Sequence, residues 1–271
     1  MKAGISTACL FPLDLEQSLH RLGERGVRFS ECFFNTPSEL KAPAVRRLKE
    51  AAAFYGMEIA SIHSFHSEME TFYFFTNYKN RLEDGIEQYR RYFEAAAELG
   101  AKYLIFHGDY HFSREAMLTE EQSFENIHTL WSVGKEYGVE LLHENVSRCK
   151  GGQPDYLRRL HHAIPEMGFV LDCKQALRSG HRPEEFVQTL GSSIRHIHLS
   201  DSLMVNASIE KDCLPPGKGN YDFERLFRLL KEQGADPSMM IELYSDSFET
   251  MEELVESCDF IQRKLDIVNN Y

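Results

Sequence analysis

The sequence lacks the features that mark membrane, secreted and metal-finger proteins. No apolar run approaches the roughly 20 residues that a membrane-spanning helix needs. The amino terminus carries one early lysine and is interrupted by Pro12, so it is weak as a signal peptide. The six cysteines are scattered, with no C-x-x-C pair, which argues against a disulfide framework or a zinc knuckle and fits a reducing compartment. We therefore expect a cytoplasmic protein with no membrane partner.

Basic residues are fewer than acidic ones. The chain has 30 Lys and Arg against 42 Asp and Glu, a formal net charge of -12. A surface of that sign repels phosphate backbones, so we expect no nucleic-acid partner. The first predicted strand, Ala3–Ile5, is not followed by a G-x-G-x-x-G turn, which argues against a doubly wound dinucleotide-binding sheet.

What the sequence does contain is a repeated strand, loop and helix pattern. Short apolar runs alternate with longer amphipathic ones about eight times along the 271 residues, and eight such units close a parallel barrel. We predict an α/β fold with one domain, residues 1–271, forming a (β/α)8 TIM barrel. The remaining predicted strands are Val27–Glu31, Ile59–His63, Tyr103–His107, Glu140–Glu144, Gly168–Asp172, His196–Ser200 and Met239–Leu243. The predicted helices are Leu15–Arg25, Pro43–Tyr55, Arg81–Leu99, Glu120–Tyr137, Pro183–Leu190, Phe223–Gln233 and Phe248–Leu265.

Polar side chains stand at the ends of most of these strands, where the active sites of such barrels lie. Carboxylates gathered there without a cation would repel one another and raise each other's pKa, so the pattern favours a divalent metal ion. Four candidates come from successive strands, Glu144, Asp172, His198 and Glu242. Their three carboxylates and one imidazole suit Mn²⁺, Mg²⁺ or Co²⁺, and Zn²⁺ is also compatible. The seven candidates are Glu31, His63, His107, Glu144, Asp172, His198 and Glu242.

The order of these motifs resembles the xylose isomerase-like barrel superfamily, over almost the whole chain. That superfamily includes sugar epimerases of the tagatose 3-epimerase type, hydroxypyruvate and inosose enzymes, and abasic-site endonucleases. The most specific parts are His196-Ile-His198-Leu-Ser-Asp201 and the loop Pro216-Gly-Lys-Gly219 before Asp222-Phe223. The others are Ile62-His63, Phe106-His107-Gly, Leu142-His-Glu144-Asn145, Leu171-Asp172 and Ile241-Glu242.

The epimerase branch of the family implies one ion held by Glu144, Asp172, His198 and Glu242. It also implies that Glu144 and Glu242 act as the acid/base pair at the carbon next to a substrate carbonyl. An ion that polarises the carbonyl stabilises an enediolate, which makes this proton transfer feasible. We therefore predict a metal-dependent isomerase or epimerase of a small sugar, ketose or sugar acid. His63 and His107 either hold a second ion or contact substrate hydroxyls.

The chain departs from both branches of the family in its histidines. Gln175 stands where the epimerases and the endonucleases have a histidine, and no histidine follows His198, so the third zinc site of the endonucleases cannot form. DNA cleavage is therefore disfavoured. Two alternatives stay open: a metal-dependent dehydratase or lyase acting on a polyol ketone, and a barrel that binds a metabolite without turning it over.

Further candidates for substrate contacts are Gln175, Lys218 and Glu31. Lys218 lies between two glycines and either reaches a substrate phosphate or carboxylate or lies in solvent. Lys174 follows the sixth strand, and its alternatives are an anionic subsite and a solvated loop charge, the latter preferred. The aromatic residues Phe33-Phe34 and Phe72–Phe75 either wall the pocket or form a subunit contact, so a homo-oligomer is left open.

Overall fold

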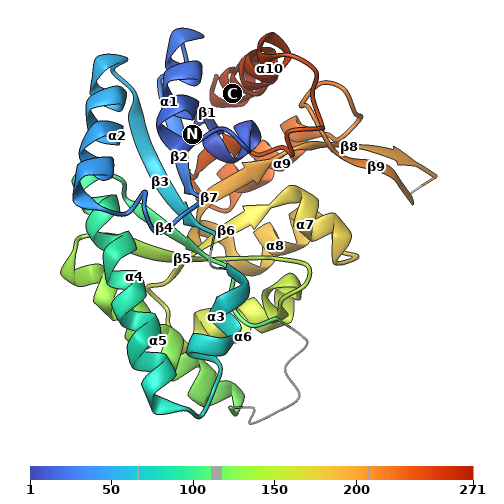
Figure 1. Ribbon diagram of the computed structural model, residues 1–271. Coiled ribbons are helices and arrows are strands. Elements are labelled where there is room, and N and C mark those ends of the chain that lie inside the picture. The colour runs from blue at the N-terminus through green and yellow to red at the C-terminus, as the bar shows by residue number, and fades with distance from the viewer. Residues whose placement is uncertain (66, 111–117, 207, 271) are drawn as a thin grey trace.

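Eight parallel strands close into a barrel with helices around it (Figure 1). The computed structural model describes residues 1–65, 67–110, 118–206 and 208–270. The strand order is β1-β10-β7-β6-β5-β4-β3-β2, so the predicted eight-stranded TIM barrel is confirmed. The barrel strands are β1 (Lys2–Ser6), β2 (Phe29–Phe34), β3 (Glu58–Ser64), β4 (Tyr103–Phe106), β5 (Glu140–Glu144), β6 (Gly168–Asp172), β7 (Ile194–Leu199) and β10 (Ser238–Ile241).

The helices follow the strands and bury one apolar face against the barrel. Short polar side chains cap the first turn of some of them: Asp14 accepts a hydrogen bond from the Gln17 amide, and Thr119 forms a capping box with Gln122. None of the helices in the described residues is both long enough and apolar enough to span a membrane. The helices are α1 (Leu15–Glu24), α2 (Ala42–Phe54), α3 (Ser67–Phe74), α4 (Lys79–Leu99), α5 (Glu120–Glu136), α6 (Pro154–Ala163), α7 (Cys173–Arg178), α8 (Pro183–Leu190), α9 (Phe223–Glu232) and α10 (Met251–Asn269).

Alternation along the strands separates the outer core from the barrel interior. In β5, Leu141 belongs to the large core between strands and helices, whereas Leu142 joins Ile105 and Val170 in a separate cluster. His143, one position before Glu144, is buried in the outer layer against Phe106, as the alternation of side chains along a strand predicts. Glu144, two residues after Leu142, therefore points into the barrel at its carboxyl-terminal end.

An antiparallel hairpin that the sequence pattern did not predict follows β7. It consists of β8 (Asp201–Val205) and β9 (Ser208–Leu214) and extends away from the barrel (Figure 1). The carboxylate of Asp201 accepts hydrogen bonds from the backbone amides of Gly217, Gly219 and Tyr221, at 2.9, 3.0 and 3.1 Å. The glycine loop that follows the hairpin is thus tied to the hairpin's base.

Candidate metal centre

A cavity of about 490 Å³ opens at the carboxyl-terminal mouth of the barrel. Its polar lining includes His63, His107, Glu144 and Glu242, and aromatic residues complete the wall. Phe33 lies among them, stacked on His63 with ring centroids 4.6 Å apart, so it is a pocket residue. Of the other aromatic candidates, Phe74 and Phe75 belong to the buried core.

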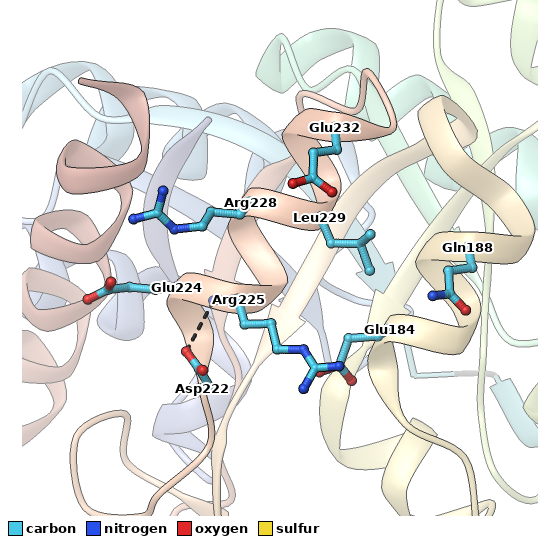
Figure 2. Close-up of a pocket in the computed structure, with 8 residues that line it drawn as sticks. All are labelled: Glu184, Gln188, Asp222, Glu224, Arg225, Arg228, Leu229 and Glu232. Carbon is cyan, nitrogen blue, oxygen red and sulfur yellow. Dashed lines mark hydrogen bonds and ion pairs between the residues drawn. The ribbon is translucent and has the colours of Figure 1, made fainter. Parts of the chain in front are cut away.

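A second hollow, of about 500 Å³, lies between α8 and α9 (Figure 2). Its walls carry charges of both signs, and Arg225 reaches towards Glu184 across it, with 3.8 Å between Arg225 Nε and Glu184 Oε1. None of the described residues lining it is a histidine or a cysteine. We therefore place the functional site at the barrel mouth, where the imidazoles and carboxylates converge.

Four side chains from four neighbouring strands meet at the floor of the mouth cavity. Each contributes one donor atom, and the four atoms lie within 4.8 Å of one another. Glu144 and Asp172 end β5 and β6, His198 lies near the end of β7, and Glu242 directly follows β10. The structure thus brings together the set Glu144, Asp172, His198 and Glu242 that the sequence singled out.

The electrostatics of the four reflect burial and close approach. Burial opposes ionisation of Glu144, yet His107 and His198 hold its pKa well below the usual range. Burial raises the pKa of Asp172 to about 7, with the Glu144 and Glu242 carboxylates adding to the effect. Asp172 also caps α7, because its Oδ1 accepts a hydrogen bond from the Gln175 amide at 2.8 Å.

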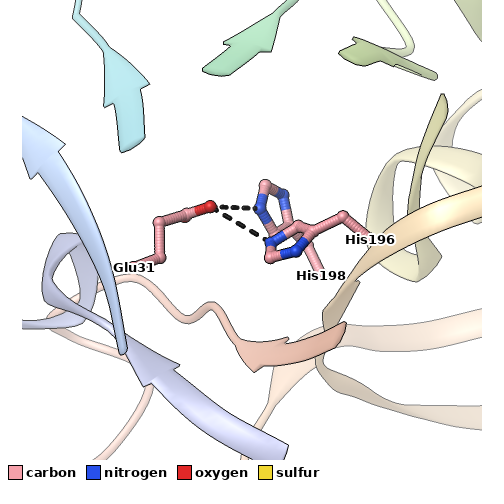
Figure 3. A group of neighbouring side chains, drawn as sticks. All are labelled: Glu31, His196 and His198. Atoms are coloured by element: carbon pink, nitrogen blue, oxygen red, sulfur yellow. Dashed lines mark hydrogen bonds and ion pairs between the residues drawn. The ribbon is translucent and has the colours of Figure 1, made fainter. Parts of the chain in front are cut away.

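His198 is oriented from below by Glu31. Nε2 of His198 lies 3.3 Å from Oε2 of Glu31, while Nδ1 faces Glu144 Oε1 at 3.2 Å and Glu242 Oε2 at 3.6 Å. The same Glu31 oxygen lies 3.2 Å from Nε2 of His196, and Figure 3 shows Glu31 reaching across to both rings. A carboxylate that accepts from Nε2–H leaves the Nδ1 lone pair directed at the carboxylate cluster.

Glu31 therefore does not take the substrate-contacting position that we expected. It is fully buried below the cavity, and Ser6 and Ser61 also donate to its carboxylate, at 3.0 and 2.7 Å. The reason lies in the strand: β2 runs on to Phe34, so Glu31 sits three residues before its end instead of at it.

His63 and His107 form a second group with the other oxygen of Glu144. Nε2 of His107 lies 2.9 Å from both His63 Nε2 and Glu144 Oε2. His63 donates its Nδ1 hydrogen to the Ser64 carbonyl at 2.9 Å, so its Nε2 is an acceptor when the ring is neutral. The His107 hydrogen can serve only one of its two neighbours.

Lys174 enters the site although a solvated position was preferred for it. Its side chain is 4% exposed, and Nζ lies 3.3 Å from Glu242 Oε2 and 3.5 Å from Asp172 Oδ2. Burial opposes the charge, but Asp172 and Glu242 hold the pKa of Lys174 well above its usual range. Lys174 also lies over the ring of Tyr244, 4.8 Å from its centroid.

Of the other two expected substrate contacts, one lies in the cavity and one does not. Gln175 lines the cavity, and its side-chain oxygen accepts from Ser147 N and Oγ at 3.1 and 2.6 Å. Lys218 is 59% exposed and points to α10, with Nζ 3.6 Å from Glu253 Oε1. Of the two alternatives for Lys218, the structure thus has the solvated one, and Lys218 is not among the residues that line the cavity.

The residues present fit a divalent cation. Oε2 of Glu144 is buried and finds no hydrogen-bond donor of good geometry among the described residues. The other oxygen of Glu144, Oε1, faces His198 Nδ1 at 3.2 Å. Three carboxylates and one imidazole form a hard donor set typical of Mn²⁺, Mg²⁺ or Zn²⁺ sites. Lys174 brings one positive charge to these three carboxylates, and a cation shared by the four donors would balance the charge that remains.

Comparison with known proteins places the fold. The model of the family described as xylose isomerase-like TIM barrel matches residues 17–264. No curated protein matches the chain. A solved D-tagatose 3-epimerase-like protein is 22% identical with a TM-score of 0.81, over 100% of this chain and 99% of that one.

Two further solved structures are similar over nearly their full length. One is an L-ribulose 3-epimerase, 16% identical with a TM-score of 0.76, over 100% of this chain and 96% of that one. The other is the IOLI protein with a bound zinc atom, 18% identical with a TM-score of 0.73, over 100% and 99% of the two chains. At these identities the similarity is one of fold.

Proposed function

The chain belongs to the xylose isomerase-like TIM barrel family, and from that premise we propose that it is a divalent-metal-dependent isomerase or epimerase. Its substrate is a small sugar, ketose or sugar acid. The observation that carries the proposal is the convergence of Glu144, Asp172, His198 and Glu242, with donor atoms within 4.8 Å of one another.

A divalent ion held by these four residues would polarise a substrate carbonyl and the neighbouring hydroxyl, which lowers the cost of forming an enediolate. The rest of the chemistry falls to the protein. It must remove a proton from the carbon next to the carbonyl and return a proton to the enediolate. Both steps need a carboxylate within reach of that carbon.

Glu144 and Glu242 meet this need. Both line the cavity, and they come from strands that are separated in the barrel by β6 and β7. Burial disfavours the charge of Glu242, but His198 and Lys174 hold its pKa below the usual value, so it is ionised and able to accept a proton. With Glu144 likewise ionised, one carboxylate removes the proton and later releases it to solvent, and the other delivers a proton that it has first taken up from solvent water.

The remaining cavity residues supply binding and exclusion of water. The amide nitrogen of Gln175 and the ring nitrogens of His63 and His107 are hydrogen-bonding groups for substrate hydroxyls. The aromatic wall around Phe33 provides apolar surface against the sugar carbons. The epimerase names of two similar solved structures agree with this assignment.

The test is hydrogen exchange between solvent and a panel of ketoses. We expect purified protein loaded with Mn²⁺ to catalyse incorporation of deuterium from D₂O into the ketose, at the carbon next to the carbonyl. NMR of the ketose measures this exchange. Glu144→Gln and Glu242→Gln should each lower the exchange rate by about 100-fold or more, the usual contribution of a general acid or base.

Glu140→Gln is the matched control. Glu140 lies at the other end of the same strand β5, so the same substitution there should leave exchange unchanged. Exchange that survives both Glu144→Gln and Glu242→Gln would contradict their roles. Loss of water from a ketone substrate, seen as a product lighter by one water in mass spectrometry, would point to a dehydratase instead.

A further inference from the structure

Lys174 is the one lysine or arginine among the described residues that line the mouth cavity. It lies in the first turn of α7, two residues after the metal-binding candidate Asp172. The side chain is almost fully buried, and the carboxylates of Asp172 and Glu242 lie 3.5 and 3.3 Å from Nζ. A buried ammonium of this kind keeps its charge because it is paired.

The oxygen that Lys174 contacts on Glu242 also faces the four-residue cluster. Glu242 Oε2 lies 3.3 Å from Lys174 Nζ and 3.6 Å from His198 Nδ1. An ion shared by the cluster would therefore draw on an oxygen that already balances the ammonium. Tyr244, whose ring lies 4.8 Å from Nζ, offers only a weak cation–π contact in compensation.

The balance of charge shows what Lys174 changes for a ligand. Three carboxylates with one divalent ion and neutral imidazoles would leave a net negative site, which repels an anionic substrate. The ammonium of Lys174 offsets the excess charge of the three ligands, so an anionic ligand at the cavity wall is repelled less, while Glu31 keeps its own negative charge below His198. The ammonium also presents N–H donors to an anionic oxygen from the cavity wall shared with Gln175 and Tyr244.

We propose that Lys174 makes this site select a substrate that carries a carboxylate beside the reacting carbonyl, a keto sugar acid in preference to a neutral ketose. The proposal rests on the metal-dependent function proposed above and names its substrate class. A divalent ion held by the cluster and the ammonium of Lys174 would both attract the ligand's carboxylate, so ion and acidic ligand should bind cooperatively.

The experiment compares two ligands that differ in one group. D-fructose and 2-keto-D-gluconate share a carbon skeleton, and the second has a carboxylate in place of the first's C1 hydroxymethyl group. Binding of each to Mn²⁺-loaded protein is measured by isothermal titration calorimetry. We expect the wild type to bind 2-keto-D-gluconate at least tenfold more tightly than D-fructose.

Three variants test the role of the Lys174 charge. Lys174→Met removes the ammonium and keeps the length of the side chain; it should abolish the preference and, without ligand, bind Mn²⁺ about tenfold more tightly. Lys218→Met removes an exposed lysine that points to α10, outside the cavity, and should keep the preference. Lys174→Arg retains the charge and should keep part of the preference for 2-keto-D-gluconate.

Several results would overturn the proposal. Equal binding of the two ligands by the wild type would do so, even if Lys174→Met fails to fold. So would an unchanged preference, or unchanged Mn²⁺ affinity, in folded Lys174→Met. If the wild type binds no Mn²⁺ at all, the metal-dependent function itself fails. Binding of Mn²⁺ with hydrogen exchange on ketoses, but no preference for the acid, removes only the substrate class.

Discussion

Replacing Glu31 by glutamine changes the charge of one buried side chain and hardly its size, and we expect the change to weaken divalent-cation binding. Glu31 does not touch the proposed ion. It acts through His198, whose Nε2 lies 3.3 Å from Glu31 Oε2 while Nδ1 faces the cluster. Glu31 is thus a positioning residue, which holds His198 in the tautomer that can donate a lone pair.

The size of the effect follows from the contact that is weakened. A hydrogen bond to a charged acceptor contributes about 1.5–3 kcal/mol and one to a neutral acceptor about 0.5–1.5 kcal/mol. The loss of about 1.5 kcal/mol corresponds to roughly tenfold in affinity. If the glutamine instead turns its amide N–H₂ towards His198, the hydrogen moves to Nδ1 and the loss is larger, up to the 100-fold or so known for partners of metal-binding histidines.

The assay is calorimetric titration of Mn²⁺ into the wild type and Glu31→Gln, with the His198 tautomer followed by ¹⁵N NMR. Glu39→Gln is the control, because Glu39 follows the same strand and accepts hydrogen bonds from the backbone amides of Leu15 and Asn35. A folded Glu31→Gln protein that binds Mn²⁺ within twofold of the wild type would refute the positioning role.

Three further outcomes are expected. Burial raises the pKa of Asp172 to about 7, so a proton competes with the cation below that pH. The affinity for Mn²⁺, measured by calorimetric titration, should therefore rise between pH 6 and pH 8. An affinity that does not change over this range would contradict the competition. Gly219→Ala places a Cβ against the Ser202 carbonyl and the Asp201 carboxylate. It should lower the free energy of unfolding by about 1–3 kcal/mol, measured as a lower Tm. An unchanged Tm would be inconsistent with the close contact between this loop and Asp201. Phe106→Ala empties a fully buried site and should cost about 3–5 kcal/mol in urea unfolding, a value that a loss under 1 kcal/mol would refute.

The barrel could be predicted from the sequence because its signals are local and repeated. Each strand is a short apolar run, and the helices between them carry an apolar stripe and a terminal glycine such as Gly100, which adopts the left-handed conformation after α4. The hairpin of β8 and β9 escaped prediction because it lies outside the barrel. The far ends of its two strands are exposed, so Val205 and Ile209 stand among polar neighbours without a buried face to impose a pattern.

In the site, too, the residues that follow the strand pattern could be predicted and the others could not. Glu144, Asp172, His198 and Glu242 lie at or near strand ends, and a parallel barrel brings such ends to one mouth, so their convergence follows from the strand pattern alone. Lys174 and Glu31 depend on finer details. The direction of Lys174 is set by the first turn of α7, and the depth of Glu31 by how far β2 continues beyond it. Neither is encoded in hydrophobic periodicity.

The proposed metal centre can be observed in a crystal of the protein soaked with Mn²⁺, by recording the anomalous signal of manganese. The proposed centre should give an anomalous peak at the barrel mouth, coordinated by Glu144, Asp172, His198 through Nδ1, and Glu242, at distances of about 2.0–2.3 Å. A peak elsewhere, or no peak at the mouth with millimolar Mn²⁺ in the crystal, would contradict it.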